Sequence, residues 1–116
     1  MPINSRQKGA RGERQVRDLF RDFGLIARRG QQFSGGSDSP DVIVPELAGT
    51  MHLEVKWVQG IIGQKMRSAI EQSQRDGGGK TWTVFHKENN CPWLVTLDAR
   101  EFVKLLADGL PVEVHE

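Results

Sequence analysis

Apolar residues recur at helical spacing in three parts of the chain. The first pattern predicts a helix over residues 5–23, followed by Gly24, a residue type that commonly ends helices. The second predicts a helix over residues 64–76. The third predicts a helix over residues 98–108, with Asp98 as its N-terminal cap. The apolar positions on these helices are Val16, Leu19, Phe20 and Phe23, then Met66, Ala69 and Ile70, and finally Phe102, Val103, Leu105 and Leu106.

Short runs rich in β-branched and aromatic residues predict five strands between these helices. They cover residues 25–29, 42–44, 51–57, 81–86 and 93–97. The turn-forming residues 45–50 predict that strands 42–44 and 51–57 pair as an antiparallel hairpin, with Val44 opposite Met51. Residues 87–92 are expected to form the loop of a second hairpin. The predicted order is therefore α-β-β-β-α-β-β-α, in a single domain of residues 1–116.

The first predicted hairpin has a chemical consequence, because it places Asp41 opposite Glu54. Lys56 lies two residues further along and so shares the face of Glu54, while apolar side chains, including Trp57, occupy the other face. Cβ atoms of opposed residues are about 5 Å apart, and like charges at that distance repel. A divalent metal between the two carboxylates would relieve the repulsion.

This arrangement resembles the PD-(D/E)XK nuclease superfamily, with Pro40-Asp41 as the first half of its motif and Glu54-Val55-Lys56 as the second. Over residues 9–97 the chain is similar to the small phage and archaeal Holliday-junction resolvases. The similarity includes Glu13 on the first helix and Gln72 on the second. It implies an α/β restriction-endonuclease-like core, in which helices flank a mixed central sheet, plus a C-terminal helix.

The resemblance also implies a site. Asp41, Glu54 and the backbone carbonyl of Val55 would bind Mg²⁺, with Mn²⁺ as a substitute, and Glu13 would add a ligand directly, through water or at a second metal. Lys56 would orient or activate a water molecule, and Gln72 would lie near the scissile phosphate or that water. Two plainer interpretations stay open: Lys56 could form an ordinary salt bridge to Glu54 or Asp41, and Glu13 could be a helix charge without a role.

Glycines near Glu13 bear on the same site. Gly9 and Gly12 lie within one turn of it and are expected to permit close approach of neighbouring backbone.

The charge of the chain is uneven although its net value is only +1. Residues 1–29 hold eight Arg or Lys against three acids, which favours nucleic-acid contact at this end, although solvated arginines on an exposed helix would give the same count. The candidate DNA-binding residues are Arg11, Arg14, Arg28, Arg29 and Lys87. His52 and His86 stay outside the predicted catalytic set, and the three tryptophans are expected in the core.

Composition bears on the cellular location of the protein. The single Cys91 cannot form an internal disulfide, and no apolar stretch reaches the length of a membrane span, so a reducing cytoplasmic location is expected. The expected function is a magnesium-dependent endonuclease acting as a homodimer on branched DNA. The alternatives are a nuclease of the same superfamily for repair, restriction or phage DNA processing, and a catalytically silent DNA-binding module.

Overall fold

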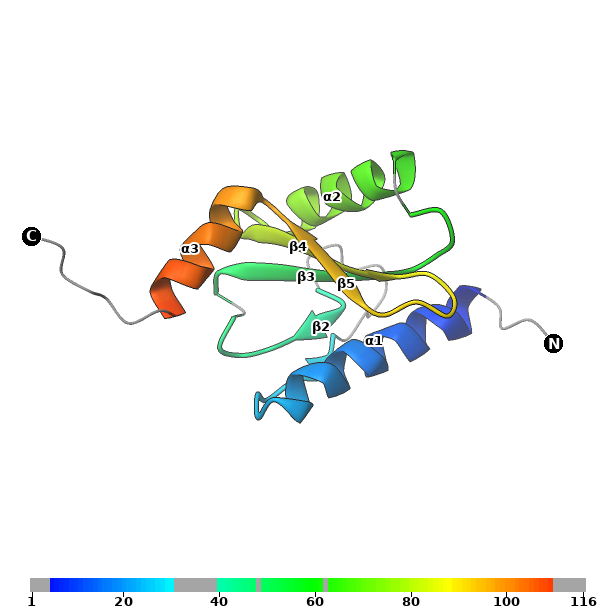
Figure 1. Cartoon of the computed structure of the whole chain (residues 1–116), viewed down its shortest axis with the longest axis horizontal. Coiled ribbons are helices and arrows are strands. Elements are labelled where there is room, and N and C mark those ends of the chain that lie inside the picture. Colours follow the sequence, from blue (N-terminus) through cyan, green and yellow to red (C-terminus); the bar gives the residue numbers. More distant parts are fainter. Residues whose placement is uncertain (1–4, 31–39, 48, 62, 110–116) are drawn as a thin grey trace, which may run out of the picture.

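The computed structural model describes residues 5–30, 40–47, 49–61 and 63–109. Their elements follow the predicted order (Figure 1). The helices are α1 (Ser5–Asp22), α2 (Gln64–Asp76) and α3 (Ala99–Gly109), and the strands are β1 (Arg28–Arg29), β2 (Val42–Ile43), β3 (Met51–Trp57), β4 (Thr81–Lys87) and β5 (Leu94–Leu97). None of the described helices is both long and apolar enough to cross a membrane.

The central sheet has the strand order β3-β4-β5 and is mixed, as predicted. β3 and β4 run parallel, with Glu54 opposite Val84, and α2 forms the crossover between them. β4 and β5 run antiparallel, with Val84 opposite Thr96, which confirms the second hairpin. In Figure 1, α1 and α2 lie on opposite sides of this sheet. The result is a restriction-endonuclease-like α/β core with an added C-terminal helix.

The first predicted hairpin is wrong. β2 pairs antiparallel with β1, where Arg28 lies opposite Ile43, and β1 is shorter than the predicted strand over residues 25–29. Next to β3 the chain forms a single backbone bond at this point, from Asp41 N to Leu53 O at 2.9 Å. Val42 and Ile43 form their ladder with β1.

The middle of β3 is buried on both faces. Leu53 and Val55 join Val16 of α1 in the apolar core. His52 and Glu54, on the opposite face, are only 2% exposed each. Strands that have a helix on each side of their sheet lose their solvent-facing side, so the polar residues of β3 lie inside the protein.

α1 contributes fewer side chains to the core than its apolar stripe predicts. Val16 is fully buried and the ring of Phe20 lies 5.5 Å from that of Phe85, whereas Leu19 and Phe23 are exposed. The helix ends as predicted at Gly24, which has φ +85° and donates its N–H to Arg21 O.

The two glycines near Glu13 behave differently. A Cβ at Gly12 would lie 3.2 Å from the Trp93 ring and 3.4 Å from Val55, so the absence of a side chain brings α1 close to β3. A Cβ at Gly9 would meet no heavy atom within 4 Å, and the expectation of close packing there is wrong.

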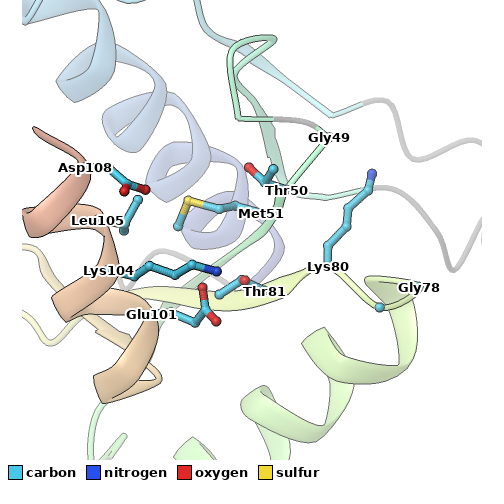
Figure 2. Close-up of a pocket in the computed structure, with 11 residues that line it drawn as sticks. Gly49, Thr50, Met51, Gly78, Lys80, Thr81, Glu101, Lys104, Leu105 and Asp108 are labelled. Atoms are coloured by element: carbon cyan, nitrogen blue, oxygen red, sulfur yellow. The ribbon is translucent and has the colours of Figure 1, made fainter.

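α3 begins at the predicted cap, since the Asp98 carboxylate accepts the backbone N–H of Arg100 at 2.9 Å. No residue of this helix is buried. A cavity of about 580 Å³ separates it from the starts of β3 and β4, and its helix side is lined by Leu105 and by the charged residues Glu101, Lys104 and Asp108 (Figure 2). The apolar residues Phe102, Val103 and Leu106 do not line this cavity and are exposed. α3 therefore presents its charged side to its own domain.

Candidate active site

The predicted acidic residues converge on one cavity of about 520 Å³ at the end of β3. Asp41 enters it from the residue before β2, Glu54 and Lys56 from β3, Glu13 from α1 and Gln72 from α2. The full lining is Lys8, Gly9, Glu13, Asp41, Glu54, Val55, Lys56, Trp57, Val58, Gln59, Lys65 and Gln72. The structure thus brings together all five predicted catalytic residues, although the first hairpin was predicted incorrectly.

Asp41 is fixed by backbone on three sides. Its N–H donates to Leu53 O, its carbonyl accepts the N–H of Gly30 at 2.9 Å, and its Oδ2 accepts the N–H of Val55 at 2.8 Å. The pKa of this carboxyl is raised to about 8, first by burial and then by the charge of Glu54 and a hydrogen bond with it, against the lowering effect of the Val55 N–H. Asp41 therefore resists ionising beside Glu54 unless a cation compensates for the charge.

Glu54 has a partner that the sequence analysis left out of the site. The Nε2 atom of His52 lies 2.8 Å from Glu54 Oε1, and both side chains are buried. A buried carboxylate with one oxygen held by a ring nitrogen has few orientations available. The signal in the sequence was the spacing of two residues, which places His52 on the Glu54 face of the strand.

Lys56 is held by Gln72 rather than by an acid. Its Nζ donates to Gln72 Oε1 at 3.2 Å, across the gap between β3 and α2. Within the described part of the chain, Lys56 has no carboxylate oxygen within 4.0 Å, so the plain salt bridge to Glu54 or Asp41 is not formed. The ammonium group therefore lies at the cavity without a direct salt bridge to a described carboxylate.

Glu13 lies at the cavity but is already neutralised in part. Its Oε1 accepts two bonds from Arg29, from Nε at 3.1 Å and from Nη2 at 2.9 Å. Of the predicted DNA-binding residues, Arg29 is thus tied to the site, whereas Arg11, Arg14 and Arg28 are exposed. Lys87 is half-buried, with its Nζ 4.6 Å from the centre of the Trp57 ring.

The donors at this cavity fit a hard cation that keeps several waters. No cluster of three or more His, Cys, Asp or Glu suited to a metal ion occurs among the described residues, so a cage built only from protein side chains is not present there. Two carboxylates, Asp41 and Glu54, do line one cavity, and Val55 lines it beside them. Magnesium is commonly held by one or two carboxylates and completes its octahedron with water and phosphate oxygens.

Comparison with known proteins gives one structural likeness. No family model and no curated protein matches the sequence. Among solved structures, the chain is similar to Hjc, a Holliday junction resolvase from the hyperthermophilic archaeon Archaeoglobus fulgidus, with a TM-score of 0.50 and 22% identity. The match covers 75% of this chain and 74% of that chain. This domain therefore shares the fold of a Holliday junction resolvase.

Proposed function

We propose that this protein is a metal-dependent endodeoxyribonuclease that cleaves branched DNA, as a Holliday-junction resolvase does. The observation that carries the proposal is the meeting of Asp41 and Glu54 in one cavity beside the Lys56–Gln72 pair. The fold shared with an archaeal resolvase supports it. Such an enzyme would act in DNA recombination or repair, in the cytoplasm of a cell or of a phage-infected host.

Each residue of the cavity has a definite task in this proposal. Asp41, Glu54 and the Val55 carbonyl would hold Mg²⁺ or Mn²⁺, with Glu13 as a direct, water-mediated or second-metal ligand. The ion, when bound, would polarise the phosphate and lower the pKa of a bound water.

The remaining residues act on the groups that react. Hydrolysis forms a bond from a water oxygen to phosphorus and breaks one phosphoester bond, and a proton ends on the departing sugar oxygen. Lys56 would orient the water and offset the negative charge that develops on the phosphate, while Gln72 holds the ammonium group in place. His52 would keep Glu54 in a single orientation.

Two other functions are compatible with the fold. A nuclease of the same architecture could act on other DNA in repair, restriction or phage DNA processing. A DNA-binding module without activity could keep the fold as a scaffold. The buried acid pair weighs against that second alternative, because Asp41 beside Glu54 is electrostatically unfavourable and gives a scaffold no benefit.

A comparison of three substrates tests the proposed function. With Mg²⁺, we expect a synthetic four-way junction to be cut faster than a Y-shaped fork or a linear duplex, with two nicks related by two-fold symmetry near the branch point. Excess EDTA should abolish cleavage, because the acid pair then lacks its cation. Full activity in EDTA would contradict the metal mechanism. Equal cutting of all substrates would favour the broader nuclease, and binding without cleavage would favour the silent module.

Two symmetric cuts require two active sites, and a two-fold homodimer would supply them. α3 offers the surface for such a partner, since Phe102, Val103, Leu105 and Leu106 are exposed by 49%, 62%, 46% and 51%. Together they present on the order of 400 Å² of apolar surface, about half of the ~800 Å² that each partner gives to a stable interface.

We therefore expect a dimer at micromolar concentration that the double substitution Phe102→Glu and Leu106→Glu converts to a monomer. Both side chains are exposed in the single chain, so the fold should survive, as circular dichroism would show. Sedimentation measures the association state. Lys104→Gln, on the opposite side of the same helix, is the control and should stay dimeric. A wild-type protein that sediments as a monomer would contradict the proposed interface.

A further inference from the structure

Three cations gather around one tryptophan beside the acidic cavity. The Nζ atoms of Lys8 and Lys87 lie 5.6 and 4.6 Å from the centre of the Trp57 ring, and the Arg11 guanidinium carbon lies 5.5 Å from it. The first two helical turns of α1 supply Lys8 and Arg11, and the last residue of β4 supplies Lys87. Trp57 is only half-buried, so its predicted place in the core is wrong.

The ring is held in a fixed position by its neighbours. Its Nε1 donates to Asn89 Oδ1 at 2.9 Å, and its edge meets the ring of Trp93 at a centroid distance of 6.2 Å. Trp93 is in turn bonded through Nε1 to Gln15 of α1. Trp57 therefore forms a rigid platform that links β3, α1 and the β4–β5 loop.

The charge of this cluster is not balanced within the described part of the chain. None of the three cations has a described carboxylate oxygen within 4.0 Å. The neighbouring Glu88 is engaged elsewhere, since its Oε1 accepts the N–H of Gly60. Each cation is attracted to the aromatic ring, but the three like charges repel one another. An anion is the group that would satisfy this arrangement.

The position of the cluster indicates which anion. Lys8 and Trp57 line the same cavity as Asp41, Glu54 and Lys56. A DNA strand that places one phosphate at the two carboxylates would therefore carry its neighbouring phosphates past Trp57. Successive phosphates of a strand each carry one negative charge, which matches a row of cations next to the cleaved bond.

We propose that Lys8, Arg11 and Lys87, gathered on the Trp57 ring, form a binding subsite for the DNA backbone phosphates that flank the scissile phosphate. The assignment of the scissile phosphate rests on the proposed nuclease function, while the binding of backbone phosphates by this cluster does not. Lys8 and Trp57 were not among the DNA-binding residues predicted from the sequence.

The test measures DNA binding without cleavage, in EDTA, as a function of salt concentration. Each phosphate contact contributes about 0.9 units to the slope of log K against log salt for duplex DNA. The triple variant Lys8→Gln, Arg11→Gln and Lys87→Gln should therefore flatten the slope by about 2–3 units relative to wild type. The matched control is Arg67→Gln, Arg75→Gln and Arg100→Gln, which removes the same charge from exposed positions on α2 and α3 and should change the slope by less than one unit.

Three results would overturn the subsite. An unchanged slope in the cluster variant would place the backbone contacts elsewhere, and equal flattening in both triple variants would reduce the effect to net charge. The third result would come from single strands with and without abasic positions. If the cluster variant loses affinity only for the strand that keeps all its bases, Trp57 would be a platform for base stacking instead. The binding measurement is made without metal. If the protein failed to cleave any DNA, that result would count against the proposed nuclease function and not against the phosphate subsite.

Discussion

Asp41→Asn, Glu54→Gln and Lys56→Ala are each expected to lower the rate of four-way junction cleavage by about 10²–10³-fold or more, with little change in DNA affinity. These groups act on charge that develops during the reaction, so their removal affects the rate more than the binding of substrate. Single-turnover cleavage and a separate binding titration in EDTA distinguish the two quantities.

The effect of Mg²⁺ on the melting temperature should distinguish these three variants. A ligand present at a hundred times its dissociation constant stabilises a protein by about 2.7 kcal/mol, so Mg²⁺ should raise the melting temperature of the wild type. Asp41→Asn and Glu54→Gln should lose that increase, whereas Lys56→Ala should keep it, since Lys56 is bonded to Gln72 and holds no metal. Glu71→Gln, an exposed acid on α2, is the control for loss of one carboxylate. Full activity of Lys56→Ala would remove this residue from the mechanism.

Gly30→Ala is expected to destabilise the protein by about 3 kcal/mol, because overpacking against immobile atoms has effects of this size. A Cβ at Gly30 would lie 1.8 Å from the carbonyl oxygen of Pro40, and backbone cannot yield as a flexible side chain does. The N–H of Gly30 also donates to Asp41 O, so a shift here would move a residue of the site. The melting temperature should fall by on the order of 10 °C.

Gly9→Ala is the matched control for this substitution. Gly9 lies inside α1 and has nothing within 4 Å of an added Cβ, so alanine should stabilise the helix by about 0.5–1 kcal/mol. If Gly30→Ala melted at the wild-type temperature, the contact between Gly30 and Pro40 would not constrain the native chain.

The helices could be predicted from the sequence because their signals are local. The periodicity that predicts α2 and the cap at Asp98 both involve residues within a few positions of each other. Strand pairing was harder to predict from the sequence. The partner of β3 is β4, which follows it only after an entire helix, whereas the turn residues 45–50 favoured a hairpin with β2, which pairs with β1.

The candidate site could nevertheless be predicted from its motif. Asp41 still contacts β3 through two hydrogen bonds, one from its backbone N–H and one to its carboxylate. What the sequence could not supply was the surroundings. His52 resembles any strand histidine until its ring is found against Glu54, and alternation placed Trp57 in the core although β3 ends at the edge of the protein there. The cations around Trp57 come from α1 and from the end of β4, far apart in the sequence, so no local pattern brings them together.

The parallel pairing of β3 with β4 also determines when, during synthesis, activity can first arise. A parallel pair cannot close through a tight turn, so β3 has no ladder partner until α2 and β4 have been made, as far as Lys87. Glu13 and Asp41 leave the ribosome earlier, but the strand that carries Glu54 and Lys56 is unsupported until then. If the protein is the nuclease that we propose, a partly synthesised chain would therefore hold the acidic residues without a working site, and DNA near the ribosome would not be cut.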